Sequence, residues 1–462
     1  MVNVQPLQVG VNELGYLKTL AELPDIESMV EPEMTAAPQG KGSAFRALRH
    51  RNFKLFFYGQ MISLIGTWMQ ATALPLLVVK LRPDNTGLWL GIVSFVPLIP
   101  ILPLAIMAGS WADRFSKHKI LILTQTTLML QALVVVILTF TQSIQIWHVL
   151  ALTLVSGAAS AIDIPARQAF IVEMVDDRSD LNSAVALNSA IFNLGRAIGP
   201  VLAGLLIAPL GFSAAFLVNG LSFLAVIAGL LLMRLPPTPL QTEQPKMKAH
   251  LIEGLRYTVQ NQTVMVLMSL VAVSAFLSMP FIILMPIFAQ DSLAQSAKPI
   301  NDLLCSWVTC QVPTAASYGL LMGAFGIGAL IGAYVVGSHG DQRRGRLLTI
   351  GNLGFPVAVL IFAVSRSFWF SMAILVGVGI VFIMQNAVAN TLLQVIVPDQ
   401  LRGRLMSIYS IVLQGMQKAG GMQAGFTQAV AGAPFSVAIG AIISAVYGLI
   451  VFWRWPQIRR LK

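Results

Sequence analysis

Charged side chains are scarce in this sequence. Asp, Glu, Lys and Arg make up 11% of its 462 residues, whereas a soluble domain carries about 25% charged residues. This amount of charge cannot cover the water-facing surface of a protein of this length. A soluble globular protein is therefore excluded. Hydrophobic residues reach 56%, and the mean hydropathy is +0.76.

Histidine and cysteine are also rare, with five and two copies, and they form no cluster with metal-ligand spacing. The sequence has no GxxxxGK[ST] loop for a nucleotide and no evident nucleophile beside a base. No basic patch is interleaved with aromatic residues, as on a nucleic-acid surface. We therefore expect no metal, no cofactor and no nucleic-acid partner, and we do not predict an enzyme.

Long apolar runs dominate the chain. Each run reaches the length of about 20 residues that crosses a bilayer. Backbone groups cannot stay unpaired in hydrocarbon, so we expect helices, since β-barrel strands would be shorter and alternating. The twelve predicted spans are 53–79, 87–111, 120–141, 146–170, 182–207, 211–233, 263–289, 316–338, 347–365, 368–396, 404–428 and 434–453.

The chain contains an internal repeat. GSWAD at Gly109–Asp113 recurs as GSHGD at Gly337–Asp341, and the segment from Val175 aligns without gaps with the segment from Val397. Two similar halves around a midplane pocket are typical of secondary transporters. We predict an all-α membrane protein with twelve transmembrane helices in two pseudo-symmetric six-helix bundles. The predicted divisions are a flexible cytosolic tail at 1–44, bundles at 45–235 and 263–455, a cytoplasmic linker with a surface helix at 236–262, and a cytosolic tail at 456–462.

Basic residues predict the orientation. Most of the 30 Lys and Arg fall on the side of the predicted spans that also holds both termini. The positive-inside rule makes that side cytoplasmic, and the net charge of +11 follows from this topology. Residues 1–40 contain no apolar core of a secretory signal. We expect a multi-pass protein with both termini cytoplasmic.

Polar side chains recur on single faces of several predicted spans, at steps of three and four residues. In lipid such side chains must face protein or water. A stripe therefore either lines a transport path or bonds one helix to another, and the sequence leaves both open. The candidate pathway residues are Gln60, Ser63, Thr67, Gln70, Ser156, Ser160, Gln385, Asn386, Asn390 and Lys418.

Asp163 is the only acid that we place well inside a predicted span, and Arg167 follows it by four residues. Burial raises the pKa of a carboxyl group and a nearby cation lowers it, so Asp163 is a candidate for proton coupling. A fixed structural ion pair with Arg167 is the alternative, which we favour because the i,i+4 spacing brings the two together.

Arg196 and Lys418 occupy equivalent places in predicted spans 5 and 11. A cation at the midplane costs about 2.5–3.5 kcal/mol, which indicates a compensating partner. That partner is either an anionic substrate, or helix carbonyls and the membrane interface reached by snorkelling. Small residues beside Arg196 predict close helix packing and a bend. They are Gly195, Gly199, Pro200 and Gly204.

Cys305 and Cys310 lie in the segment 291–316, which the topology places outside. That compartment permits disulfides, and a Cys305–Cys310 bond and two free thiols are equally compatible with the sequence. We expect this segment to be a loop that covers the external mouth only loosely.

Several motifs resemble the major facilitator superfamily. GSWADRFSKHK at Gly109–Lys119 resembles its signature between spans 2 and 3, and GRAIGPVLAG at Gly195–Gly204 resembles the Gly-Pro motif of exporters. Four further segments resemble the enterobactin-exporter branch of drug–proton antiporters, which includes macrolide-efflux proteins. They are Phe45–Gln70, Asp163–Val175, Ala186–Pro200 and Val397–Ser410.

The resemblance implies alternating access, with spans 1, 4, 7 and 10 around the cavity, in a bacterial inner (plasma) membrane. It also implies a cytoplasmic gate in which Asp113 and Asp341 meet the N-termini of spans 11 and 5, where a helix dipole favours an anion. The gate residues are Gly109, Asp113, Arg114 and Asp341. One departure is Lys418, which stands where the family suggests an apolar residue or proline.

We expect a proton-coupled exporter of a small amphipathic compound, siderophore-like or multidrug-like. The expected partners are a small-molecule substrate, protons and the lipid bilayer, and one chain supplies a whole path, so a monomer is expected to suffice. Lipid or lysolipid flipping by the same fold is the first alternative. A non-transporting membrane sensor or assembly factor is the second.

Overall fold

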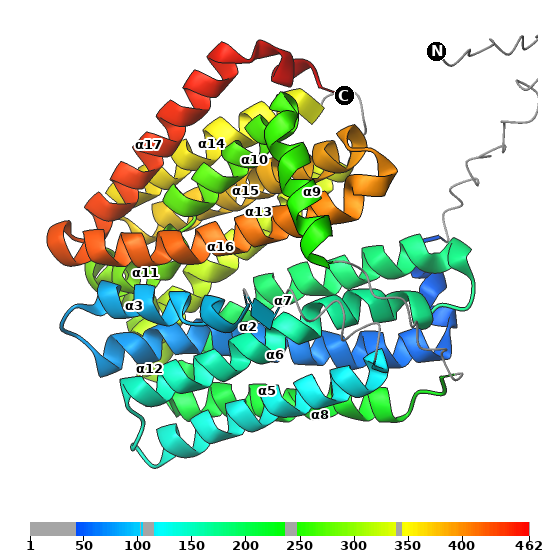
Figure 1. Ribbon diagram of the computed structural model, residues 1–462. Coiled ribbons are helices and arrows are strands. Elements are labelled where there is room, and N and C mark those ends of the chain that lie inside the picture. Colours follow the sequence, from blue (N-terminus) through cyan, green and yellow to red (C-terminus); the bar gives the residue numbers. More distant parts are fainter. Residues whose placement is uncertain (1–42, 102, 105–114, 236–246, 339–343, 462) are drawn as a thin grey trace, which may run out of the picture. The chain divides into compact units, whose positions relative to one another are not determined.

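The computed structural model describes residues 43–101, 103–104, 115–235, 247–338 and 344–461. Every regular element in these ranges is a helix (Figure 1). The first half contains η2 Ser43–Arg49, α2 Arg51–Leu81, α3 Thr86–Phe95, α5 Lys117–Phe140, α6 Ile146–Glu173, η3 Arg178–Asp180, α7 Leu181–Leu210 and α8 Phe212–Leu231. The second half contains α9 Met247–Gln260, α10 Gln262–Leu277, α11 Phe281–Ile287, η4 Phe288–Ser292, α12 Ala294–Trp307, α13 Thr314–Ser338, α14 Arg344–Val364, α15 Phe368–Ile396, α16 Asp399–Ala431, α17 Ala433–Arg454 and η6 Pro456–Arg460.

Among the described residues, ten helices are long and apolar enough to cross a membrane. The two predicted spans that are missing from this set are 87–111 and 404–428. The first corresponds to a shorter apolar helix, Thr86–Ile101, whose continuation lies partly outside the described residues. The second corresponds to α16, which is long but rich in polar residues. The count of twelve therefore stays a prediction.

Two glycines turn the chain at equivalent places in the two halves. Gly211 joins α7 to α8 with φ +78°, and Gly432 joins α16 to α17 with φ +84°. A residue with a Cβ is strained in this conformation, whereas glycine adopts it freely. The same device thus returns the chain after the long helices α7 and α16, as the internal repeat of the sequence predicts.

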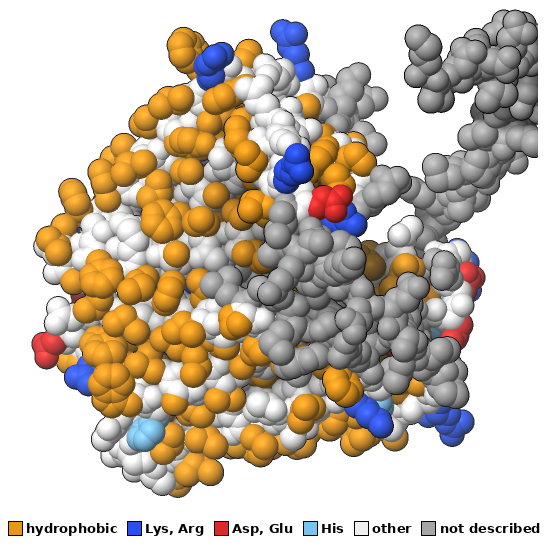
Figure 2. Space-filling view, in the orientation of Figure 1, with side chains coloured by type: hydrophobic (Ala, Val, Ile, Leu, Met, Phe, Trp, Pro, Cys, Tyr) orange, Lys and Arg blue, Asp and Glu red, His pale blue; other side chains and the backbone are white. Residues whose placement is uncertain are grey.

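The outer surface of the described residues after position 43 is largely apolar. Large hydrophobic side chains are exposed along most of the long helices, and Figure 2 shows them spread across the visible face with charged groups near its margins. Hydrocarbon is the solvent that suits such a surface. The finding supports the membrane assignment made from composition.

The buried apolar residues fall into three clusters, which differ in the half of the chain that supplies them. One cluster mixes both halves, with Phe216 and Ala203 beside Phe281 and Phe325. The second contains only residues after position 262, and the third only residues before position 236. The mixed cluster lies where the helices approach the Cys305–Cys310 disulfide, which we call the disulfide end. The other end, near η2 and η6, is here called the terminal end.

Two pairs of helices make most of the helix contacts between the halves. α3 packs on α16, which we call the first seam, and α7 packs on α13, the second seam. Both seams depend on glycine, because backbone meets backbone. A Cβ added at Gly425 would lie 2.3 Å from the carbonyl oxygen of Gly87, and one added at Gly326 would lie 2.5 Å from the Cα of Ala197. Small residues permit such close approach of membrane helices.

Segment 291–316 differs from its prediction as a loose loop. It contains the helix α12, whose Ala297 and Asn301 are buried against neighbouring helices. The chain after α12 is also tied down, because the backbone amides of Gln311 and Val312 donate to the carbonyl oxygen of Ala208 at 2.7 and 3.1 Å. These bonds cap the end of α7, where helix carbonyls lack intrahelical partners.

The segments at the ends of the second half are helical as well. α9 occupies most of the region where a surface helix is predicted, and its Glu253 pairs with Arg404 of α16. At the C-terminus, η6 buries Ile458 against α14, and the amide of Gly345 donates to the carbonyl oxygen of Leu461 at 2.9 Å. Residues 456–461 are therefore packed against the second half.

Candidate functional site

The two cations predicted near the midplane lie at the seams. Lys418 on α16 directs its Nζ at the carbonyl oxygen of Ser94 on α3, at 3.4 Å. Arg196 on α7 lies with its guanidinium 5.9 Å from the ring centroid of Phe382 on α15. Each cation thus reaches from its own half to a helix of the other half. Both are half-buried.

Arg196 keeps unused hydrogen-bonding capacity. Its Nη2 donates to the side chain of Asn193 at 2.6 Å, and its buried Nε has no hydrogen-bond partner among the described residues. A guanidinium has five N–H donors in a planar fork, which suits a carboxylate or phosphate. The arrangement can therefore bind an anion between the halves.

Lys418 and Arg196 lie beside glycine contacts between the halves. Along the first seam, Gly425 meets Gly87 near the disulfide end and Gly421 meets Gly91 one turn further in, just before Lys418 reaches Ser94. Along the second seam, Gly326 of α13 contacts Ala197 of α7, next to Arg196. Each cation thus lies about one turn or less from a close backbone contact between the halves.

Asp163 is fully bonded within the first half. Its carboxylate is 1% exposed and accepts from the hydroxyl of Thr124 and the amide of Gln125, each at 2.8 Å. Arg167 pairs with its other oxygen. A buried carboxylate with a cation and two donors is satisfied as an anion. These contacts support the structural alternative for the Asp163–Arg167 pair.

The stripe on α2 divides into buried and exposed members. Gln60 and Ser63 are each 2% exposed. Gln70 joins a network inside the first half, because it donates to Gln131 at 3.1 Å and accepts from Asn219 at 2.7 Å. Thr67 is exposed and donates to a carbonyl of its own helix. Of this stripe, Thr67 is the exposed member, and Gln70 is half-buried with its amide group bonded inside the first half.

On α6, Ser156 and Ser160 are half-buried, and the Ser156 hydroxyl donates to the carbonyl oxygen of Thr153 at 3.0 Å. On α15, Gln385 is 1% exposed and accepts from the hydroxyl of Ser274 on α10 at 3.1 Å. Gln385 is therefore a packing contact between two helices of the second half.

Asn386 and Asn390 lie one turn apart on α15 and are both half-buried. The Asn386 side chain donates to the carbonyl oxygen of Phe382 at 3.0 Å, and Asn390 accepts from Gln394. The hydroxyl of Tyr409 on α16 donates to the Asn386 carbonyl oxygen at 3.2 Å. These two asparagines keep partial exposure and satisfy their bonds locally, so they combine with Thr67 and the two serines as the accessible polar set.

The small residues of α7 contact two different helices. A Cβ at Gly199 would lie 2.5 Å from Cβ of Trp68 on α2, and Gly195 packs near the same side chain. Gly204 instead faces Ala315 on α13, and Pro200 is buried in the same helix. α7 therefore uses one glycine pair within its half and Gly204 across the second seam.

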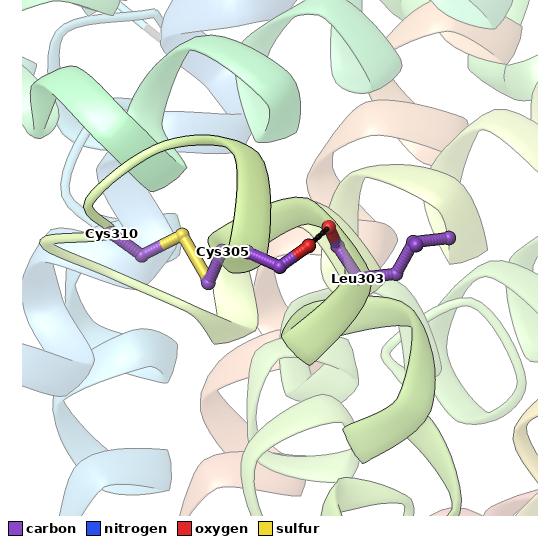
Figure 3. The surroundings of a disulfide bond; sticks show 4 residues. Leu303, Cys305 and Cys310 are labelled. Carbon is purple, nitrogen blue, oxygen red and sulfur yellow. Dashed lines mark hydrogen bonds between the residues drawn. A yellow bond between two sulfur atoms is a disulfide. The ribbon is translucent and has the colours of Figure 1, made fainter.

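Cys305 and Cys310 form a disulfide that closes the end of α12 (Figure 3). In the same turn the Ser306 hydroxyl donates to the carbonyl oxygen of Leu303 at 2.7 Å. The bonded loop leads directly into Gln311 and Val312, which hold the end of α7. The disulfide thus stabilises a loop of the second half that contacts the first half.

The four predicted gate residues lie outside the described part of the chain: Gly109, Asp113, Arg114 and Asp341. Sequence reasoning did not select Thr124, Gln125, Gln131 or Asn219, which complete the polar networks of the first half. A signal was available, because three of them are polar side chains within one predicted span, 120–141.

Comparison with known proteins now identifies the family. The sequence model described as transmembrane secretion effector, which belongs to the major facilitator superfamily, matches residues 42–460. The chain belongs to this family. The family recognition made from the motifs is thereby confirmed, and the protein is a multi-pass membrane transporter of the major facilitator type.

Several relatives of this protein are named as siderophore or drug transporters. It is 22% identical to the enterobactin exporter EntS of Salmonella choleraesuis, covering 89% of this chain and 94% of that protein. It is 25% identical to the multidrug efflux pump Tap of Mycolicibacterium fortuitum, covering 77% and 83%. It is 31% identical to the staphyloferrin A transporter of Staphylococcus aureus, but over only 38% of this chain and 44% of that transporter.

Solved structures share the fold. A bacterial homologue of the human lysosomal transporter Spinster, in an inward-facing and unoccupied conformation, superposes with a TM-score of 0.63 at 15% identity, covering 89% of this chain and 98% of that one. The nucleoside transporter NupG gives a TM-score of 0.62 at 13% identity, covering 90% and 100%. The secretion-effector chain therefore has the fold of these transporters.

Proposed function

We propose that the protein is a secondary active transporter that exports a small amphipathic compound by alternating access, with protons as the driving ion. The observation that carries this proposal is the division of the core. One apolar cluster contains both halves at the disulfide end, whereas each half has its own cluster at the terminal end. Halves joined in this way can rock and expose a central site to either side in turn.

The proposed transporter has twelve spans in two six-helix bundles. α3 and α16 serve as spans 2 and 11, since they pack on each other across the first seam. The polarity of α16 fits this role, because a helix that faces a water-filled path need not be apolar all round. Its side chains Gln414, Gln417 and Gln423 keep exposed or half-exposed surface.

The terminal end is assigned to the cytoplasm of a bacterial inner membrane, because most basic residues gather there. In that orientation the described state is inward-facing, with the disulfide end closed and external. The Spinster homologue that shares the fold was solved in an inward-facing conformation. The gate formed by Gly109, Asp113, Arg114 and Asp341 would close the cytoplasmic end in the opposite state, and one chain suffices for the path.

The proposed substrate carries an anionic group. Arg196 and Lys418 are half-buried cations from different halves, and each contacts a helix of the opposite half. An anion between them would offset the cost of keeping two cations within the membrane. Carboxylate- or catecholate-bearing siderophores meet this requirement, and the names of the relatives EntS and the staphyloferrin A transporter point the same way.

Substitution of Lys418 tests this proposal. Purified protein in liposomes is assayed for uptake of anionic siderophores and of neutral drug-like compounds, with and without a pH gradient. A hydrogen bond to a charged group contributes about 1.5–3 kcal/mol, so Lys418→Gln should raise the KM for the anionic substrate about 10- to 150-fold. The KM for a neutral substrate should change little.

Lys119→Gln is the matched control, because Lys119 is exposed on α5. Equal KM values for Lys418→Gln and this control, in correctly folded protein, would remove the anion site. Gradient-independent movement of lipids in place of solute would replace export by lipid flipping.

A further inference from the structure

A short segment between α12 and α13 is bonded to the opposite half of the molecule. We call residues 308–313 the strap. The strap amides of Gln311 and Val312 donate to the carbonyl oxygen of Ala208 on α7, at 2.7 and 3.1 Å. Ala208 is 0% exposed, and Val312 packs on the apolar cluster to which both halves contribute. The strap therefore continues the chain of the second half and is anchored on the first half.

The strap is also held within its own half. The disulfide joins Cys310 of the strap to Cys305 of α12 (Figure 3), and the amide of Ala315 on α13 donates to the carbonyl oxygen of Val312 at 3.1 Å. Ala315 lies on the second seam, since a Cβ added at Gly204 of α7 would lie 2.5 Å from its carbonyl oxygen. The crosslink and the bond at Val312 therefore fix the strap to α12 and α13.

The disulfide determines how the strap responds when the second seam parts. With Cys310 fixed to α12, α7 cannot leave α13 without breaking both bonds to Ala208. Without the crosslink, the strap can extend to about 3.3–3.6 Å for each residue, so its bonds to Ala208 need not hold the halves together. Two neutral hydrogen bonds of ordinary strength correspond to a factor of about 5–150 in an equilibrium constant. An intact disulfide should therefore raise the closed-to-open ratio at the disulfide end by this factor.

A dissolved reagent can reach the disulfide. Both cysteines are half-buried, and every residue between them is exposed, including Trp307 at 82%. In the orientation proposed above, this surface faces the external medium. Exposed disulfides are reduced more readily than buried structural ones. The sequence contains no third cysteine, so reduction yields two thiols that have only each other as a partner.

We propose that the Cys305–Cys310 disulfide is a redox modification site, and that an external dithiol weakens closure of the disulfide end by reducing it. The inference rests on the proposed alternating-access cycle and its orientation. A thiolate of the reagent attacks one sulfur of the bond and releases the other sulfur as a thiolate. The second thiolate of the reagent then displaces the protein from the mixed disulfide. The protein gains two electrons and two protons as two thiols, and the reagent leaves as its own disulfide.

The test compares how often the second seam opens with and without the crosslink. Full-length Val201→Cys protein in proteoliposomes is exposed to a membrane-impermeant maleimide, and labelling at position 201 is quantified by mass spectrometry of that peptide. Val201 contacts α13, because a Cβ added at Gly323 would lie 2.3 Å from its Cγ2, so labelling reports parting of the seam. The three samples are the oxidised protein, the protein reduced with dithiothreitol that is then removed without air, and Cys305→Ser/Cys310→Ser. The second and third should label about 5- to 150-fold faster than the first.

Two single substitutions separate the bonds across the halves from the bonds within the loop. Gln311→Pro keeps the disulfide and removes one of the two amide donors to Ala208, so the rate should rise about 2- to 13-fold. Ser306→Ala is the matched control. It removes the hydrogen bond from the Ser306 hydroxyl to the carbonyl oxygen of Leu303 within α12, and the rate should stay at the value of the oxidised protein.

Equal labelling of the oxidised protein and the double serine variant, both folded, would overturn the role of the strap in closure. Faster labelling of the serine variant, with no response of the native disulfide to dithiothreitol, would overturn the modification site. If the serine variant fails to fold, the comparison of oxidised and reduced protein decides, and equal rates there overturn the proposal.

Export by the same preparation separates this inference from the proposed function. Intact export with a seam that ignores dithiothreitol would reject only the modification site. A seam that responds to dithiothreitol without any solute export would reject only the exporter.

Discussion

Gly326 on α13 provides a direct test of whether the second seam opens during transport. A Cβ added there would lie 2.5 Å from the Cα of Ala197, 2.8 Å from the carbonyl oxygen of Arg196 and 3.0 Å from the amide nitrogen of Ala197. All three atoms are backbone atoms of α7, so no side chain can rotate away. In Gly326→Ala the two helices must separate by roughly the 0.9 Å between 2.5 Å and an ordinary contact of 3.4 Å.

Overpacking of this kind costs about 1–3 kcal/mol. The cost applies in the state closed at the disulfide end and disappears when the seam parts. Gly326→Ala should therefore shift the ratio of open to closed molecules about 5- to 150-fold toward the open state. The shift requires no loss of folding, because the open state relieves the contact.

The measurement is the rate at which a membrane-impermeant maleimide, added from the disulfide side, labels Val201→Cys on the second seam. The two native cysteines are paired with each other and do not compete. The rate should rise 5- to 150-fold in Gly326→Ala, in line with the population shift.

Two glycines supply controls. Gly415→Ala meets nothing within 4 Å and should leave the rate unchanged. Gly379→Ala would place its Cβ 2.2 Å from the carbonyl oxygen of Phe325, inside the second half, so it should lower thermal stability without changing the rate. If Gly326→Ala labelled as slowly as Gly415→Ala, the second seam would not open, and rocking across it would be refuted.

Two further predictions concern the disulfide and the buried ion pair. Replacing Cys305 and Cys310 with serine removes a crosslink that stabilises this short loop by about 2 kcal/mol through chain entropy. Amide hydrogen exchange at Gln311 and Val312 should therefore become faster. Unchanged protection of these amides would show that the loop needs no crosslink. Asp163→Asn leaves the charge of Arg167 unpaired, which costs about 3–5 kcal/mol of folding stability. The Tm of this variant should therefore fall, while its transport should still depend on the pH gradient. Loss of that dependence at unchanged Tm would make Asp163 the proton-coupling group.

Much of the fold could be predicted from the sequence, because lipid imposes strict rules. A segment that crosses hydrocarbon must be apolar and helical, so ten of the predicted spans correspond to long apolar helices. The repeat of GSWAD and GSHGD indicated two similar halves. The family followed from local motifs such as GRAIGPVLAG. α16 is less apolar than the other long helices because it packs on protein, including Gly87 and Ser94 of α3.

The candidate site could be predicted only in part. Helical spacing shows that Gln60, Thr67 and Gln70 share a face of α2, but not what that face meets. The structure turns Gln70 toward Gln131 and Asn219 and leaves Thr67 exposed. Hydrogen-bond partners more than sixty residues apart in the chain depend on how helices pack, which spacing within one helix cannot encode.

The sequence by itself determined the membrane solvent, the helical spans, the repeat and the presence of two cations within the predicted spans 5 and 11. Each of these follows from residue type and local order. The tertiary structure alone decided that Arg196 and Lys418 reach across to the opposite half. The physical reason is that burial and partners of a charge are properties of surfaces brought together by packing, and they have no counterpart in a single segment.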